Sequence, residues 1–192
     1  MSLLSAKNVS DERTFAAVIT QVGGDVFDRA NSQSKKVGPY VDTHVTAAEG
    51  VVWANGNTEF DAMTLTIKYR ELLPNQSEER FMEFRLTDTQ REAVLRGEEP
   101  SIAASSSLGR FVLQLDKLGL PGADDSALEG EVLVITRKRR EVERGGKMRT
   151  NITHDVLASV GTENDWDAAE AGRIIAAAAA PKRELATSAA SF

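Results

Sequence analysis

Apolar and polar residues alternate in short runs across the first half of the chain, and glycine, asparagine or proline separates the runs. Such alternation is typical of antiparallel strands that bury one face. In "DAMTLTIKYRELL" the apolar Leu65, Ile67 and Tyr69 share one face, and Lys68 and Arg70 lie on the other. Together with "ERFMEFRLT" this segment predicts a hairpin across "PNQSEE".

Further strands are predicted on both sides of Gly23-Gly24, at Tyr40 to Thr46, and at Val51 to Trp53 before the turn pair Asn55-Gly56. The segment "SQSKK" is predicted to be a basic polar loop. Near the C-terminus, "EVLVITRKRREVERGGKMRTNITHDVLASV" predicts a long hairpin that turns at the glycine pair 145–146, where glycine allows a positive φ.

Two short helices are predicted between the strands. The first begins at Thr87, which has Gln90 at capping-box spacing, and ends at Gly97. The second begins at Ser106 or Ser107 and ends at "GLP". Its apolar residues fall on one helical stripe: Leu108, Phe111, Val112, Leu115 and Leu118. The chain is therefore predicted to be mainly β, as a barrel or a sandwich, since both have short alternating strands.

Charge is segregated along the chain. The formal net charge is -6, yet residues 137–149 contain seven Lys or Arg and two Glu, a local charge of +5. The strand before this block is apolar from Val132 to Ile135, so the basic part is predicted to leave the core and project. Such a ribbon can grip a phosphate backbone, or its charges can simply keep a strand edge from aggregating. The basic residues concerned are Arg137, Lys138, Arg139, Arg140, Arg144, Lys147 and Arg149.

Exposed aromatic rings would complete a nucleic-acid groove, because bases stack on them. Three candidates are Tyr40, which lies opposite Val41 and Val45 in its strand, Trp53 next to the turn, and Phe81 on the wetter face of its strand. For each ring taken alone, packing in the core is the alternative interpretation. The cations expected beside these rings are Lys35, Lys36, Lys68 and Arg70.

The order of these elements resembles phage-type single-stranded DNA-binding proteins of the OB-fold class. The resemblance lies in "KKVGPY", in the helix "SLGRFVLQLDKLGLPG" and in "LEGEVLVITRKRRE" with "GGKMRTNITHDVLA". It covers roughly residues 14 to 158. It implies an OB-like β-barrel with a projecting basic hairpin, and it implicates Arg137 to Arg149, Lys35, Lys36, Lys68 and Arg70 in binding.

We expect an N-terminal arm over residues 1–13, a domain over 14–160 that the resemblance implies is OB-like, and an alanine-rich segment over 161–192, where the composition changes. In the last of these, any helix near 165–180 is expected to be marginal, and the final residues to be disordered. The expected function is binding of single-stranded DNA without strong sequence preference, in replication or recombination. Homo-oligomers, and a replication or recombination protein recruited by the C-terminal segment, are further expected partners. The alternative is a structural or assembly protein of a viral particle.

Composition argues against catalysis. The chain has no cysteine and only His44 and His154, and it lacks the phosphate loop and the glycine-rich dinucleotide motif. His154 alternates with Ile152 and Val156, which indicates a partly buried strand histidine. We therefore expect no enzyme, cofactor or metal site, although magnesium binding at the acidic clusters stays open. No segment is apolar for long enough to span a membrane or to act as a leader, so a cytoplasmic location is expected, the host cytoplasm if the protein is viral.

Overall fold

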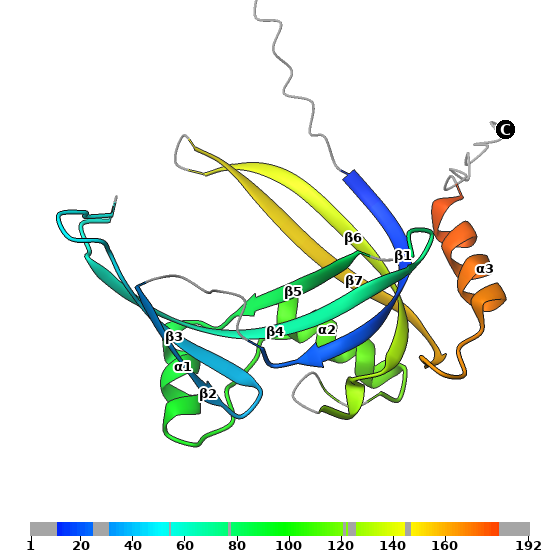
Figure 1. The fold of residues 1–192 in the computed structure, drawn as a ribbon, viewed down its shortest axis with the longest axis horizontal. Coiled ribbons are helices and arrows are strands. Elements are labelled where there is room, and N and C mark those ends of the chain that lie inside the picture. Colours follow the sequence, from blue (N-terminus) through cyan, green and yellow to red (C-terminus); the bar gives the residue numbers. More distant parts are fainter. Residues whose placement is uncertain are drawn as a thin grey trace, which may run out of the picture.

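The computed structural model describes residues 11–24, 31–53, 55–76, 78–120, 122, 126–144 and 147–180, without the side chains of Ser126, Arg144 and Lys147. Figure 1 shows a strongly curved sheet with helices against it. The strands are β1 (Asp11–Val22), β2 (Ser32–Val37), β3 (Tyr40–Thr46), β4 (Glu59–Leu73), β5 (Glu79–Arg85), β6 (Glu131–Arg144) and β7 (Lys147–Thr162). The helices are α1 (Asp88–Leu95), α2 (Ser107–Lys117), α3 (Ala168–Ala179) and the short 3-10 turn η1 (Ser126–Leu128).

The long strand β4 organises the sheet. Its residues 64–70 pair with β5, residues 59–65 with β3, and residues 67–73 with β1. The β4 residues that pair with β5 overlap those that pair with β3 and those that pair with β1. β5 therefore occupies one edge of β4, and β1 and β3 lie end to end along the other edge. From β1 the sheet continues to β6 and β7, and from β3 to β2.

The sheet is not closed into a barrel. Among the described residues, β5 pairs only with β4 and β7 pairs only with β6, so each leaves one edge open. The mainly β prediction is confirmed. Besides the two predicted helices the chain has a third, α3 of twelve residues, in the segment where only a marginal helix was expected.

The core lies on the concave face of the sheet. β1, β4 and β5 place alternate residues there, including Phe15, Leu65 and Met82, and α2 adds Phe111 and Leu115. A smaller cluster on the opposite face is covered by α3. Its members are Ala16, Val18, Val132, Val134, Val160 and Ala171. The alanine-rich helix is therefore packed against β1, β6 and β7, and residues 181–192 lie outside the description.

Two local predictions differ from the structure, and a third falls outside the described residues. "SQSKK" is not a loop but most of β2, whose backbone pairs with β3. Val51 to Trp53 is not a strand: Val51 and Val52 are exposed, and Trp53 begins a tight turn in which Gly56 has a φ of +82°. β1 pairs with β4 and β6, and the strand expected after Gly23-Gly24 falls at residues 25–30, outside the description.

Both predicted helices are confirmed. Thr87 and Gln90 form the reciprocal capping box of α1, and Ser106 caps α2 by accepting a hydrogen bond from the Gly109 N–H. Gly109 also lies against the chain before the helix, where a Cβ atom would meet the Ala103 carbonyl oxygen at 2.2 Å. The absence of a side chain at Gly109 is what lets α2 approach this close. Within the described residues, no helix is long and apolar enough to cross a membrane.

We predict that Gly109→Ala lowers the free energy of unfolding by about 2 kcal/mol or more, because either α2 or the Ala103 segment must shift. The matched control is Gly172→Ala in α3, where an added Cβ meets nothing within 4 Å. That change should instead stabilise by about 0.5–1 kcal/mol, the usual gain of alanine over glycine in a helix. Urea denaturation of both variants tests the pair, and equal effects would contradict this account of Gly109.

Candidate nucleic-acid interface

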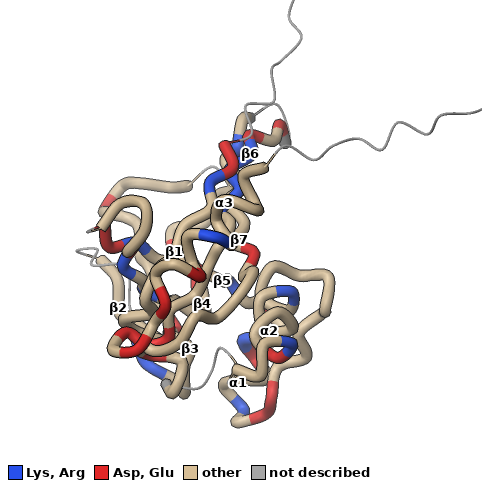
Figure 2. The backbone as a smooth tube through the Cα atoms, turned by 90° about the vertical axis from the view of Figure 1, so that its right-hand side faces the viewer, with Lys and Arg blue, Asp and Glu red and all other residues tan. Residues whose placement is uncertain are grey.

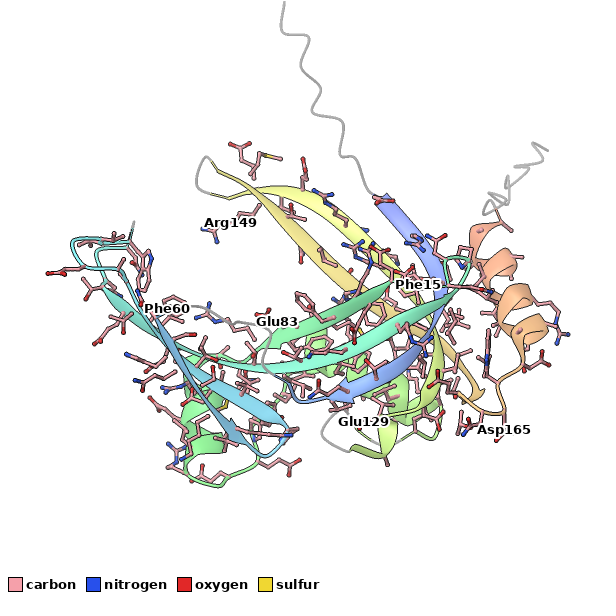
Figure 3. The ribbon with its side chains drawn as sticks, viewed as in Figure 1. Phe15, Phe60, Glu83, Glu129, Arg149 and Asp165 are labelled. Carbon is pink, nitrogen blue, oxygen red and sulfur yellow. The ribbon has the colours of Figure 1, made fainter. Side chains whose placement is uncertain are left out.

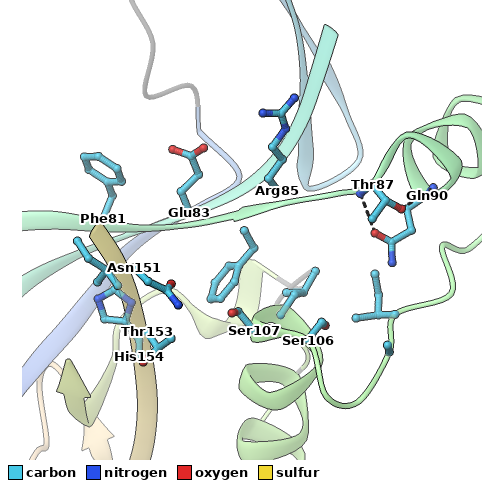
Figure 4. Close-up of a pocket in the computed structure, with 15 residues that line it drawn as sticks. Phe81, Glu83, Arg85, Thr87, Gln90, Ser106, Ser107, Asn151, Thr153 and His154 are labelled. Carbon is cyan, nitrogen blue, oxygen red and sulfur yellow. Dashed lines mark hydrogen bonds between the residues drawn. The ribbon is translucent and has the colours of Figure 1, made fainter. Parts of the chain in front are cut away.

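Two adjoining pockets lie along the open edge of β5. The first, of about 570 Å³, lies between β5, the open edge of β7 and the N-terminal ends of α1 and α2 (Figure 4). The second, of about 120 Å³, lies over β3, β4 and β5. Glu83 and Arg85 line both pockets, so the two form one surface, which we call the groove. The residues that define the groove are Phe81, Glu83 and Arg85 of β5, residues 151–154 of β7, Phe60, Ala62 and Thr64 of β4, and Thr43 and Val45 of β3.

Two hairpins rise on either side of this groove. Figure 3 shows Glu83 at the middle strand β5, Phe60 on the β3–β4 hairpin and Arg149 on the β6–β7 hairpin. On the first hairpin Trp53 packs edge-on against Phe60, with ring centroids 5.0 Å apart. The guanidinium of Arg85 lies 5.8 Å from the Phe60 ring, which is a cation–π distance.

The floor of the groove follows from the period-two alternation of β5. Met82 and Phe84 are buried in the core, so Phe81, Glu83 and Arg85 turn outward, as the sequence predicted. Phe81 is 48% exposed and pairs across the strands with Lys68 of β4. This places an exposed ring beside a cation.

The basic hairpin has two faces. Its cross-strand pairs place Arg137 with His154 on the face that continues the core. They place Arg140 with Asn151 on the other face, which Arg149 shares because it lies two residues from Asn151. Burial decreases from Thr136, which is 4% exposed, to the exposed Arg139, so the predicted projection is confirmed. The side chains of Arg144 and Lys147 lie outside the description, as does the glycine turn between them.

Several predicted cations already have acidic partners. Lys138 Nζ lies 3.1 Å from Asp155 and 3.8 Å from Glu12, and Arg139 lies 3.8 Å from Glu141. Arg70 forms an ion pair with Glu163. Figure 2 shows acidic positions among the basic ones along the projecting part of β6.

Other cations have no such partner. Within the described part of the chain, Lys36, Lys68, Arg140 and Arg149 take part in no ion pair. All four are partly or fully exposed. They therefore supply positive charge that the protein itself does not neutralise.

The two lysines of β2 point in opposite directions. Lys36 pairs across the strands with Val41, which shares the face of the groove residues Thr43 and Val45. Lys35 pairs with Asp42 on the other face, where Asp42 bonds bidentately to Arg91 of α1. Tyr40 also lies on that other face and packs against the core. The structure thus groups Lys36 with the groove, and it places Lys35 and Tyr40 away from it.

A cluster of charged side chains lies at one end of the core, next to the β6–β7 hairpin. Glu71 is completely buried, and its carboxylate lies 2.5 Å from Arg13 and 3.2 Å from Arg80. Burial raises the pKa of the neighbouring Tyr69 to about 12. The sequence did not single out the Arg13–Glu71 pair, because partners 58 residues apart in the chain leave no local signal.

His154 borders this cluster and lines the groove, and its ring meets Tyr69 edge-on at 6.1 Å. The predicted partly buried histidine is confirmed. Its Nε2 atom is buried and has no hydrogen-bond partner among the described residues. Burial, and next the nearby charge of Arg137, lower its pKa from 6.5 to about 4, so the ring is neutral at neutral pH.

This shift predicts a dependence of stability on pH. An unfolded histidine takes up its proton near pH 6.5, whereas the folded one does so only near pH 4, so its contribution to stability is complete above pH 6.5 and is lost as the pH falls. As the pH falls from 6.5 to 4, the free energy of unfolding of wild type should decrease by on the order of 3 kcal/mol more than that of His154→Gln. Urea denaturation of both proteins at several pH values measures the difference, and parallel curves would contradict the shift.

Phe60, Arg85 and Asn151 are groove residues that the sequence analysis did not select. Arg85 could have been predicted from the sequence, because alternation places it on the same face of β5 as Phe81. Phe60 and Asn151 were not, because they reach the groove only through strand pairing. In comparisons with known proteins, no family model and no curated protein matches this chain.

Proposed function

We propose that the protein binds single-stranded DNA without strong sequence preference, and that the strand lies in the groove between the two hairpins. The observation that carries this proposal is the exposed Phe81 ring beside Lys68, in a groove bordered by the hairpin that carries Arg140 and Arg149. Single-strand binding sites combine stacking rings with cations that follow the backbone. The role would be to protect or present single strands in replication or recombination, without catalysis.

Strand order supports an OB-like assignment. β5, β4, β1, β6 and β7 are neighbours in that order, and α1 and α2 lie in the chain between β5 and β6. OB-folds are partly open five-stranded barrels that bind oligonucleotides on their second and third strands and on the loops 1–2 and 4–5. In that comparison β4 and β5 take the place of strands two and three. The β6–β7 hairpin takes the place of loop 4–5.

The acidic remainder of the chain supports a single path for the strand. Because residues 137–149 carry +5 in a chain of -6, the other surfaces are on balance negative and repel phosphate. A protein-docking role, as in a viral assembly, is favoured instead by apolar side chains on the hairpin, since Met148 is 62% exposed and Ile152 42%. Binding of DNA decides between the two functions.

The test is fluorescence anisotropy with labelled oligo-dT of about 30 nucleotides at about 50 and 200 mM salt. We expect tight binding that weakens steeply with salt, and weaker binding of a duplex of equal length, because its bases cannot reach Phe81. No binding at the lower salt concentration would refute the proposal. It would make the hairpin a protein-docking element.

Replacing the stacking ring isolates its share of the affinity. Phe81→Ala should weaken oligo-dT binding by about 1–3 kcal/mol, because one base loses its aromatic platform. Phe81→Tyr keeps the ring and should bind like wild type. Since Phe81 is half exposed, neither change should alter the thermal transition appreciably. Equal affinity of Phe81→Ala and wild type would remove Phe81 from the site.

A further inference from the structure

Three arginine residues come together at the base of the β6–β7 hairpin. Arg13 of β1 lies directly opposite Arg137 of β6. Arg80 of β5 reaches the same place, because it shares the carboxylate of Glu71 with Arg13. Burial raises the pKa of Tyr69, and the charges of all three arginines act against that rise. The three guanidinium groups therefore lie around one point, near the Tyr69 side chain.

The pairing of Arg13 with Arg137 is unfavourable by itself, because like charges directly opposite each other on neighbouring strands destabilise a sheet. Arg13 is compensated by the buried Glu71, whose carboxylate lies 2.5 Å away. Arg137 is only partly exposed, and in the described part of the chain it takes part in no ion pair. A half-buried cation opposite a second cation favours an anion as its partner.

The charges at this place leave one positive charge over. Arg80 has Glu78 as a second partner, so three arginines stand against two carboxylates, those of Glu71 and Glu78. His154 lies opposite Arg137 on β7, and its neutral ring adds no charge. A phosphodiester carries one negative charge, and a guanidinium group matches two of its oxygens with parallel N–H donors. The charge balance therefore fits one phosphodiester.

The same place is open to solvent and continuous with the groove. The side chains of Arg13 and Arg80 keep 31% and 29% exposure, so a ligand reaches them without opening the core. His154 connects the arginines to the groove, because it pairs with Arg137 and lines the same pocket as Phe81. Arg13 bonds to Glu71 through one terminal nitrogen and has further N–H donors for a second anion.

We propose that Arg13 and Arg137 together bind one phosphodiester of the single strand, at a position that we call the phosphate site. The inference rests on the proposed function and deepens it, because it fixes one point of the backbone next to the base that stacks on Phe81. The phosphate supplies the counter-charge that Arg137 lacks, while Glu71 continues to hold Arg13 in place.

The first measurement is the thermal transition of the free protein in sodium phosphate and in sodium chloride of equal ionic strength. Inorganic phosphate is the probe, because it offers the same oxygens without a base or a sugar. Wild type should unfold about 3 °C higher in phosphate at about ten times the dissociation constant. Arg137→Gln should lose this gain, and in chloride it should be at least as stable as wild type, because the repulsion with Arg13 is gone. The matched control Arg173→Gln, in α3, should keep the gain.

The second measurement is anisotropy with labelled oligo-dT, which distinguishes a phosphate of the strand from free phosphate. At about 50 mM salt, Arg137→Gln should bind about tenfold more weakly than wild type. Its slope of log affinity against log salt should fall by about 0.7, the share of one single-strand phosphate. Inorganic phosphate should compete with oligo-dT for wild type more strongly than chloride does, but not for Arg137→Gln. Arg173→Gln should bind like wild type.

The other outcomes are distinguishable. An equal transition of wild type in phosphate and chloride, or an equal gain in Arg137→Gln, would refute the phosphate site. Tight oligo-dT binding that Arg137→Gln leaves unchanged would refute the inference and leave the proposed function intact. A gain in phosphate that depends on Arg137, without any binding of oligo-dT, would refute the proposed function and the strand phosphate, and would assign the site to free phosphate.

Discussion

Removing three of the predicted binding cations that have no ion pair among the described residues, by Lys68→Ala, Arg140→Ala and Arg149→Ala together, is expected to weaken oligo-dT binding by about 500-fold at about 50 mM salt. Each contact with a single-strand phosphate contributes about 0.7 to the slope of log affinity against log salt, so three contribute about 2. The slope should fall by that amount in the variant. Anisotropy titrations at several salt concentrations measure both quantities.

The matched control removes three exposed cations from the helices by Arg110→Ala, Lys117→Ala and Arg173→Ala. These residues also make no ion pair within the part of the chain that the structure describes, and the net charge changes equally. If affinity depends on the groove, the control should keep nearly the wild-type slope. Equal losses in both triple variants would show that net charge, rather than a defined path, attracts the strand.

Glu71→Ala is expected to lower the free energy of unfolding by about 3 kcal/mol. The carboxylate is completely buried and pairs with both Arg13 and Arg80, so its removal leaves Arg13 without its counter-charge and Arg80 with only its second partner, Glu78. The effect should be at the lower end of the range for buried pairs, because both arginine side chains keep about 30% exposure and reach water. Urea denaturation at neutral pH measures the change.

Glu163→Ala provides the comparison for Glu71→Ala. This change also removes the carboxylate partner of an arginine, Arg70, but both side chains of this pair are exposed. Exposed pairs contribute at most about 1 kcal/mol, so this variant should be nearly as stable as wild type. If the two variants lost equal stability, burial of Glu71 would not be what makes its ion pairs important.

Alternation was sufficient to predict the strands that have one buried and one wet face. Side chains alternate between the two faces of a strand, so the buried positions of β4 and β5 also fixed the outward ones. Lys68 and Phe81 were placed on the outward face in this way. The capping residues Thr87 and Ser106 likewise fixed the starts of α1 and α2, because a cap is a local interaction.

Elements without a hydrophobic face were not predictable in the same way. β2 is an edge strand with polar residues on both faces, so it resembled a loop until its backbone pairing with β3 was seen. The opposite error occurred at Val51 to Trp53, where apolar residues lie in an exposed hairpin end.

The candidate site depended even more on tertiary pairing. Whether a cation is free is decided by residues far away in the chain, as in the pairs Lys138 with Glu12 and Arg70 with Glu163. The groove itself exists because two hairpins, one from each half of the chain, border the same strand (Figure 3). The sequence predicted each hairpin strand, but not their placement on either side of β5.

The most direct test of the account is ultraviolet cross-linking of the full chain to oligo-dT, followed by mass spectrometry of the linked peptides. If the strand lies in the groove, cross-links should map to Phe81 on β5 and to the Trp53–Phe60 pair on the β3–β4 hairpin. Cross-links at Trp166 beside α3, or at Tyr40 on the far side of β3, with none at Phe81 would contradict the central claim and place the strand on another face.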